Sequence, residues 1–185
     1  IRNGSADSTF IVQASYLEVY NDKLNDMLGL SHAKGPEEMK HFHDLKMLPT
    51  AAGGISVQGL TQEVVTSVEE VMEALGRGQD QRVIAPMAMN ARSSRGHGIF
   101  TLFVKEIMAS GPERTAKLNL VDLAGMESSK KSAPVNPHKV RQEEAKNINQ
   151  SLYALGSVIE KLSSAAAGAE SRRPRARPRA PSAPP

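Results

Sequence analysis

Within residues 118–125, a short apolar run is followed by residue types that phosphate chemistry requires. The run Leu-Asn-Leu-Val can form a buried strand, and Asp122 follows it directly. Gly125 and Glu127 come shortly afterwards. A carboxylate at a strand end can hold the water shell of a Mg²⁺ ion, and a glycine N–H can approach a phosphate closely because no Cβ intervenes. The spacing therefore indicates a nucleotide-sensing loop, although ordinary strands also end in Asp and a turn.

A second polar cluster occupies residues 90–97, with the sequence NARSSRGH. The adjacent hydroxyls of Ser93 and Ser94 can ligate Mg²⁺ and donate to a phosphate oxygen. Arg95 carries a rigid charged fork that a carboxylate such as Glu127 could bind in a bidentate manner. Taken alone, the octet can equally be a solvated surface loop.

Composition restricts the class of protein. The chain has 185 residues, enough for one modest domain, and 39% of them are hydrophobic. Cysteine and tryptophan are absent and aromatic residues make up only 4%, which excludes disulfides and thiolate metal sites and disfavours base stacking. No run resembles a signal peptide or approaches the roughly 20 apolar residues of a membrane span. The first residue is Ile, so the sequence can be a fragment.

The net charge of +3 arises from the C-terminal tail. Residues 171–185 hold five Arg and no acid, which leaves 18 basic and 20 acidic residues elsewhere. No basic surface is therefore expected on the body. The Arg/Pro-rich composition predicts disorder. Such a tail could bind a nucleic acid or another polyanion weakly, or have no role, and nucleic-acid binding is not the favoured interpretation.

The apolar periodicity predicts strands alternating with helices. Ser67 and Glu70 form a capping box at the start of one helix, which Gly76 and Gly78 are expected to end. An α/β layered body follows, with ligands beyond the carboxyl ends of strands. The other predicted elements are a strand at 9–20, a short helix at 21–28, a small hairpin within 31–54, short strands within 55–66, paired strands at 97–107 and 116–122, and a helix at 142–163 with a core-facing stripe of Ile148, Leu152, Leu155, Ile159 and Leu162.

Several of these segments resemble the signatures of the kinesin motor family, in the family's order. Residues 90–97 resemble its switch I signature, Asn-x-x-Ser-Ser-Arg-Ser-His, and residues 122–127 (DLAGME) resemble its switch II signature, Asp-Leu-Ala-Gly-Ser-Glu. Residues 144–159 resemble the start of its switch II helix, and residues 15–24 its strand-to-helix segment. The resemblance implies a partial α/β kinesin-type P-loop NTPase fold over residues 1–163, with a central mixed sheet flanked by helices, followed by a disordered tail over 164–185.

The resemblance also implies a function. The implied function is that of a microtubule-dependent motor ATPase that uses ATP and Mg²⁺. The implied location is the cytoplasm, on the microtubules of the cytoskeleton, and no membrane partner is implied. Ser94 and Asp122 would hold Mg²⁺, Asp122 through water, and Arg95 would pair with Glu127 over the nucleotide. The implied catalytic residues are Arg95, Glu127 and Ser93; the implied nucleotide-binding residues are Ser94, Asp122, Gly125 and Asn90; and the implied microtubule-binding residues are Lys146, Lys130, Lys131, Lys139 and Arg141.

The chain departs from the family in three respects. No Gly-x-x-x-x-Gly-Lys-[Ser/Thr] P-loop occurs in the sequence, and the family's would be expected before Ile1. Gly96 and Met126 stand where the family has Ser. The family pattern stops at about residue 163, as a truncation, an altered splice or a mispredicted reading frame would produce. Little or no ATP turnover is expected from this chain alone, and the alternative is a non-catalytic microtubule-binding or regulatory fragment.

Overall fold

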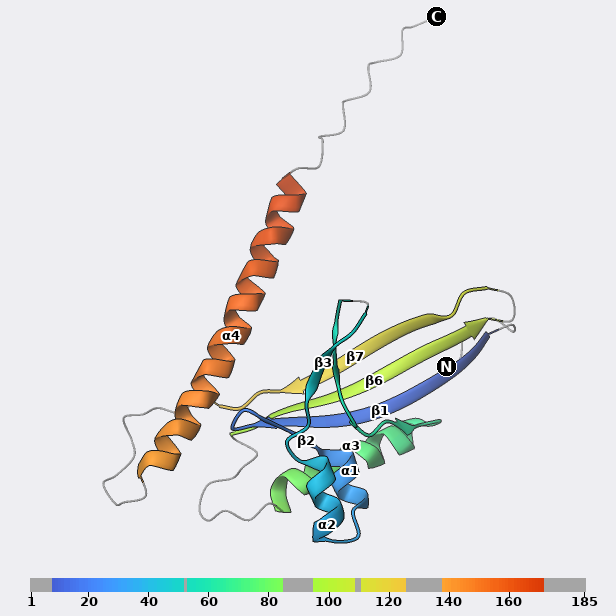
Figure 1. Cartoon of the computed structure of the whole chain (residues 1–185). Helices are drawn as coiled ribbons and strands as arrows, with labels where there is room; N and C mark the ends of the chain where they lie inside the picture. Colours follow the sequence, from blue (N-terminus) through green and yellow to red (C-terminus); the bar gives the residue numbers. More distant parts are fainter. Residues whose placement is uncertain (1–7, 52, 85–94, 109–110, 126–137, 172–185) are drawn as a thin grey trace, which may run out of the picture. The chain divides into compact units, whose positions relative to one another are not determined.

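A computed structural model of the chain describes residues 8–51, 53–84, 95–108, 111–125 and 138–171. Its largest sheet has five strands and is built on β1 (Ser8–Tyr20), which confirms the predicted strand at 9–20 (Figure 1). Every described pair in it is antiparallel, so the mixed pairing expected of the sheet is not seen among the described strands. The strand order is β2-β1-β6-β7, where β2 is Lys23–Asp26, β6 is His97–Met108 and β7 is Arg114–Asp122, and the short β5 (Glu63–Val64) also pairs with β1.

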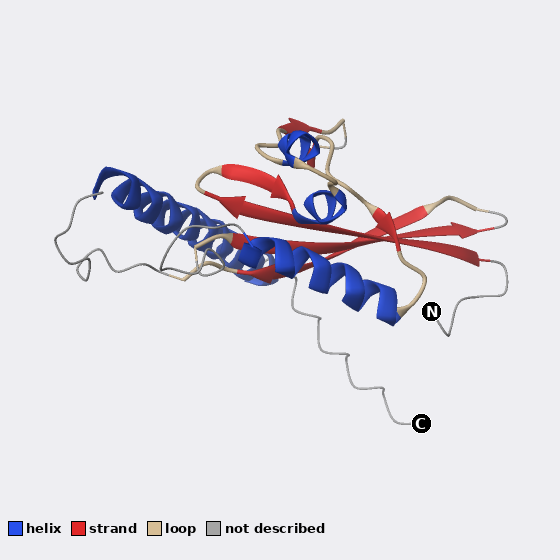
Figure 2. Ribbon diagram, turned by 90° about the horizontal axis from the view of Figure 1, so that it is seen from below, coloured by secondary structure: helices blue, strands red, loops and turns tan. Residues whose placement is uncertain are grey.

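Helices α1 (Met27–His32) and α3 (Val68–Ile84) lie on one face of this sheet (Figure 2). The core between them contains Ala14, Tyr16 and Phe100 from the sheet, together with residues of both helices. The rings of Tyr16 and Phe100 meet edge to face with centroids 5.8 Å apart, a geometry that aromatic pairs prefer. The remaining small elements are α2 (Pro36–Met39), a 3₁₀ turn (Lys40–Phe42) and a hairpin of β3 (Met47–Pro49) and β4 (Ile55–Val57).

The predicted short helix at 21–28 is wrong in its first half. Asn21 and Asp22 have φ values of 50° and 59°, and Tyr20 pairs with Lys23 across them. Two positive φ angles in a two-residue loop are the geometry of a tight hairpin turn, which Asn and Asp tolerate. The chain therefore reverses into β2, and the helix begins only at Met27.

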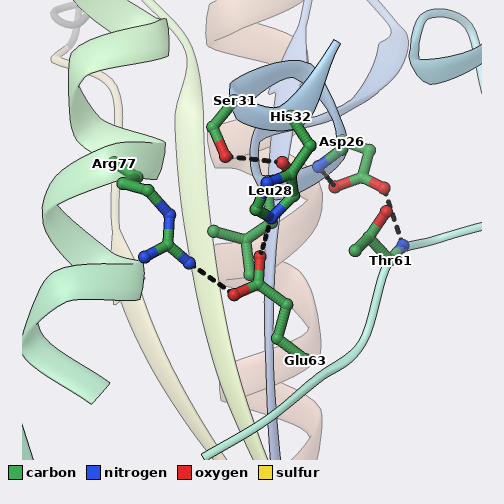
Figure 3. Close-up of polar contacts among 8 residues, drawn as sticks. Asp26, Leu28, Ser31, His32, Thr61, Glu63 and Arg77 are labelled. Carbon is green, nitrogen blue, oxygen red and sulfur yellow. Dashed lines mark hydrogen bonds and ion pairs between the residues drawn. The ribbon is translucent and has the colours of Figure 1, made fainter. Parts of the chain in front are cut away.

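Asp26 joins β2 and α1 to the segment before β5. Its side chain is fully buried and accepts hydrogen bonds from the backbone N–H of Gly29 at 2.9 Å and of Thr61 at 2.6 Å (Figure 3). Nearby, Glu63 binds His32 at 2.7 Å and forms an ion pair with Arg77 of α3. These contacts fix the helices on the sheet through charged hydrogen bonds as well as apolar packing.

Helix α3 continues through the two glycines that were expected to end it. The capping expectation holds in part, because Ser67 Oγ accepts the Glu70 N–H at 3.1 Å, while the Glu70 carboxylate bonds to Thr66. Gly78 is required by packing, since a Cβ built there would lie 2.2 Å from the ring of Tyr16. At Gly76, a Cβ would meet nothing within 4 Å.

Two substitutions test this difference. We expect Gly78→Ala to lower the free energy of unfolding by about 1–3 kcal/mol, because the added methyl overpacks the contact with Tyr16. Gly76→Ala should raise it by about 0.5–1 kcal/mol, since it removes a flexible residue from an open helix position. Urea denaturation of both variants measures these changes. Equal effects would contradict the proposed helix–strand contact.

Helix α4 (His138–Ser171) is longer than the predicted 142–163. Its Ser- and Ala-rich end continues the helix because alanine has the highest helix propensity. Asn147 Nδ2 donates to Asn21 Oδ1 at 2.9 Å, and Ile148 is buried. Residues from Asn149 onward form a separate unit, in which Leu155, Ile159 and Leu162 are exposed rather than core-facing as predicted. None of the described helices is long and apolar enough to cross a membrane.

Candidate functional site

The pairing of β6 with β7 brings the ends of the two polar motifs together. The predicted antiparallel pairing of these strands is confirmed, with Gly98 opposite Asp122. Because β6 begins at His97 and β7 ends at Asp122, the end of the octet meets the start of the sensing loop. The strand register thus places the described end of the octet beside the described start of the loop, while the predicted pairing of Arg95 with Glu127 lies outside the described residues.

The guanidinium of Arg82, near the end of α3, binds both motifs. Its Nη1 donates to Asp122 Oδ2 at 2.8 Å, and its Nη2 donates to the carbonyl oxygen of Gly96 at 2.7 Å. Nη1 also lies 3.2 Å from the hydroxyl of Tyr16, and Nε lies 3.8 Å from Glu18 Oε1. One buried side chain thus connects α3 with β1, with the segment leading into β6 and with the end of β7.

Asp122 is anchored on its inner side and open on its outer side. Its side chain is 70% exposed, whereas that of its partner Arg82 is 4% exposed. Burial opposes the charge of Arg82, but its hydrogen bonds with Asp122 and Tyr16 outweigh this effect and raise the pKa of Arg82. The carboxylate is therefore held beside a permanent positive charge while solvent still reaches it. This environment suits a group that binds a metal ion through water.

A buried carboxylate supports Arg82 from β1. Glu18 is fully buried, and its Oε2 accepts a hydrogen bond from Asn25 Nδ2 at 3.2 Å. Asn25 Oδ1 is in turn 3.0 Å from His43 Nδ1. Two buried charges each lose solvation, which their attraction and hydrogen bonds must offset. The network therefore fixes the position of the guanidinium at the motif ends.

His97 makes a second connection between the motifs. Its Nδ1 accepts a hydrogen bond from the backbone N–H of Ala124 at 3.1 Å, and its side chain is buried. A ring nitrogen can accept only when it carries no proton, so the imidazole is neutral with its proton on Nε2. Burial, followed by the positive charge of Arg82, lowers the pKa of His97, while Asp122 acts in the opposite direction.

This lowered pKa gives stability a pH dependence. Between the pKa in the folded chain and the ordinary value of about 6.5, the unfolded chain binds a proton that the folded chain excludes. The contribution of neutral His97 to stability is thus complete above the ordinary pKa and is lost as the pH falls through the lowered one. We expect the difference in unfolding free energy between the natural chain and His97→Asn to shrink with falling pH, measured by urea denaturation. A difference independent of pH would contradict this.

Four of the predicted site residues lie in the part of the chain whose exposure the structure describes. Asp122 ends β7, Gly125 is exposed in the loop that follows, Arg95 is partly buried in the turn before β6, and Lys146 is exposed on α4. Among the described residues no cluster of three His, Asp or Glu side chains could hold a metal ion. Asn90, Ser93, Ser94, Glu127, Lys130 and Lys131 lie outside the described residues, as do the side chains of Lys139 and Arg141.

No sequence pattern gave a role to Arg82, and His97 appeared only as the last residue of the octet. The position of Glu18 could have indicated a buried charge. Alternate residues of a strand point to the same face, so Glu18 lies on the buried face of β1 with Ala14 and Tyr16. A charged residue at such a position requires a buried partner. No local pattern marked Arg82 as that partner, since it lies on a helix far away in the sequence.

Comparison with known proteins agrees with the architecture. A family model described as Kinesin motor domain matches residues 1–174. Kinesin-related protein 5 of Dictyostelium discoideum is 38% identical over 160 residues, which are 86% of this chain and 15% of that protein. Kinesin-like protein KIN-7L of Oryza sativa subsp. japonica is 40% identical over 163 residues, 85% of this chain and 23% of that protein.

Solved structures give the same assignment. The structure of a fast kinesin matches with a TM-score of 0.68 and 34% identity, covering 88% of this chain and 42% of that one. A KIF14 dimer, in a two-heads-bound state with AMP-PNP and in complex with a microtubule, matches with a TM-score of 0.69 and 32% identity, covering 89% of this chain and 45% of that one. The chain thus spans less than half of each matched protein. The predicted kinesin-type α/β fold is confirmed, and the chain belongs to the kinesin motor domain family, a family of ATPase motors that act on microtubules.

Proposed function

We propose that this chain is the switch-bearing part of a microtubule-dependent motor ATPase that binds and hydrolyses MgATP. The observation that carries the proposal is the outward-facing carboxylate of Asp122, held by Arg82 at 2.8 Å beside the end of the octet. A fixed acidic group next to an exposed glycine suits a loop that responds to a metal-bound phosphate.

The residues of both motifs have distinct roles in this proposal. Ser94 and Asp122 would hold Mg²⁺, Asp122 through water, and Asn90 and Gly125 would contact the nucleotide. Bound Mg²⁺ would neutralise charge on the phosphates. Ser93 would position the reacting groups, and Arg95 would pair with Glu127 to close the site. Arg82 and His97 keep the ends of both motifs in register, and positioning accounts for most catalysis of phosphoryl transfer.

We expect the 185-residue chain alone to hydrolyse ATP slowly or not at all. Its sequence contains no P-loop, the element that supplies the backbone cradle and the lysine for the β- and γ-phosphates. Leu118, Leu120 and Val121 on β7 are about half exposed, at 54%, 50% and 53%. Apolar residues exposed on both faces of an edge strand support the view that the active body contains further covering structure.

Nucleotide binding is testable without turnover. Adding millimolar MgATP to the ¹⁵N-labelled chain should shift the Gly125 amide resonance, and ATP with excess EDTA should shift it less. Asp122→Asn keeps the side-chain volume and removes the charge, so it should reduce the effect of magnesium. Hydrolysis by the isolated chain at a typical motor rate, stimulated by tubulin, would contradict the proposed dependence on a P-loop. A Gly125 amide resonance that does not shift on addition of MgATP would contradict nucleotide binding.

Microtubule binding is proposed for the basic residues on and before α4, in the cytoplasmic cytoskeleton. Lys146 is exposed, and the related KIF14 structure is in complex with a microtubule, which supports the assignment. Lys130, Lys131, Lys139 and Arg141 are the other proposed contacts. Co-pelleting with microtubules should weaken with added salt and with Lys146→Glu. The matched control is Lys161→Glu, which changes an exposed lysine on the same helix. Microtubule binding that is insensitive to salt and to both substitutions would contradict binding through these basic residues.

The exposed Lys146 on α4 also supports a second candidate function, a non-catalytic microtubule-binding or regulatory fragment. In that case co-pelleting would respond to salt and to Lys146→Glu as above. The Gly125 amide would be unaffected by MgATP. The two candidates are therefore separated by the nucleotide titration rather than by the microtubule assay.

A further inference from the structure

We propose that His97 is a positioning residue for the loop that carries Gly125, and that its Nδ1 atom restrains the position of the Gly125 N–H through Ala124. The inference rests on the proposed function, because that function supplies the role of Gly125 as a phosphate contact. It adds a physical connection from the last residue of the octet to the loop after β7.

The contact joins two residues that are both held in place. His97 is the first residue of β6 and pairs with Val19 of β1, so its backbone is fixed by the sheet. His97 as a whole residue is 9% exposed, and Ala124 is 4% exposed. The Nδ1 atom lies 3.1 Å from the backbone nitrogen of Ala124. A rigid ring on a paired strand thus holds a loop residue two positions beyond the last residue of β7.

This contact restrains the neighbouring peptide. The Ala124 N–H is fixed by His97, and the Ala124 side chain is fixed by burial, so rotation about the bond between its nitrogen and Cα is limited. That rotation places the carbonyl carbon of Ala124, where the peptide that carries the Gly125 N–H begins. Only rotation about the Cα–C bond of Ala124 is then left to change the direction of this N–H. Gly125 itself is exposed, so its N–H remains open to a ligand. Earlier in the loop, the bond from Arg82 to Asp122 provides a second restraint.

Three substitutions separate positioning from simple packing. In His97→Asn, the side-chain oxygen is attached to Cγ, as Nδ1 is, so the acceptor remains near its place. In His97→Gln, the amide lies one bond farther out, where Nε2 lies in the ring. His97→Ala removes the acceptor altogether. Asn and Gln have the same polar group, so a difference between them reports the position of the acceptor rather than its chemistry.

The first measurement is hydrogen exchange of backbone amides in the full ¹⁵N-labelled chain. Losing the bond should speed exchange of the Ala124 amide by about tenfold in His97→Gln and His97→Ala, the size expected for one net hydrogen bond. His97→Asn should restore slow exchange. Amides of the paired β6 and β7 residues Phe100 and Leu120 serve as the internal reference. Faster exchange of the Phe100 and Leu120 amides in His97→Gln would overturn the proposal. Equal exchange of the Ala124 amide in the natural chain and the three variants would also overturn it.

The second measurement distinguishes this proposal from the proposed function. MgATP should shift the Gly125 amide in the natural chain and in His97→Asn, and by a smaller amount in His97→Gln. An equal response in His97→Gln would overturn positioning and leave nucleotide binding intact. If Gly125 does not respond in any protein while Ala124 exchange follows the expected order, nucleotide binding fails and the restraint by His97 stands.

Discussion

Replacing Arg82 with methionine should lower the free energy of unfolding by about 3–5 kcal/mol, the cost of breaking a buried charge pair by removing one partner. Methionine fills a similar volume, so little of the loss comes from an empty cavity. The buried carboxylate of Glu18 would then remain without the positive charge that lies 3.8 Å away in the natural chain. Urea denaturation followed by circular dichroism measures the change.

A double substitution shows whether the loss comes from charge. If Glu18→Leu is added to Arg82→Met, the buried carboxylate that faces Arg82 is removed as well, and apolar replacement of a buried pair is often close to neutral. The double variant should therefore be more stable than Arg82→Met alone, although Asn25 loses its acceptor. A double-mutant cycle gives the coupling energy between the two positions. Additive losses would contradict an interaction between these side chains.

Arg77 provides a matched control on the same helix. It also pairs with a carboxylate, that of Glu63, but its side chain is 38% exposed and Glu63 is 20% exposed. Water can solvate the Glu63 carboxylate that remains after Arg77→Met. The loss of unfolding free energy should therefore be about 1 kcal/mol or less, as is typical of surface ion pairs. The contrast between the two arginines follows from burial. Comparable losses would indicate that both variants merely disturb α3.

The effect of Arg82→Met should extend to the site. Without the guanidinium, Asp122 loses its inner anchor and Gly96 loses a hydrogen bond to its carbonyl oxygen. Both motif ends should then exchange amide protons faster than the rest of the sheet. This local result is separate from the loss of global stability, and it connects α3 to the proposed switch regions.

The sequence predicts the frame of this site better than its inner connections. The run before Asp122 predicts a strand, and the apolar segment after His97 predicts its antiparallel partner, so the convergence of the two motifs follows from local patterns. The contacts of Arg82 do not, because residue types alone cannot show which of many distant carboxylates a buried cation meets. Likewise, Gly76 and Gly78 predict a helix end, but the packing of Gly78 against Tyr16 overrides that tendency.

The other large effect is expected at Asp26, where one buried carboxylate accepts two backbone N–H groups. Asp26→Ala removes the cap of α1, which costs about 0.5–2 kcal/mol. It also leaves the Thr61 N–H without an acceptor in a partly buried place, which costs about 1–3 kcal/mol more. We therefore expect a loss of roughly 2–4 kcal/mol in unfolding free energy, measured by urea denaturation.

Asp26→Asn tests whether both bonds matter. Asparagine has nearly the same shape but only one acceptor oxygen, so it can keep the bond from Gly29 or the bond from Thr61 and not both. Its loss should lie between those of the natural chain and Asp26→Ala, and the amide of the residue that loses its bond should exchange faster. If Asn is as stable as Asp, the second bond contributes nothing. In that case the segment before β5 must be held mainly by its other contacts, of which the ion pair between Glu63 and Arg77 is the nearest.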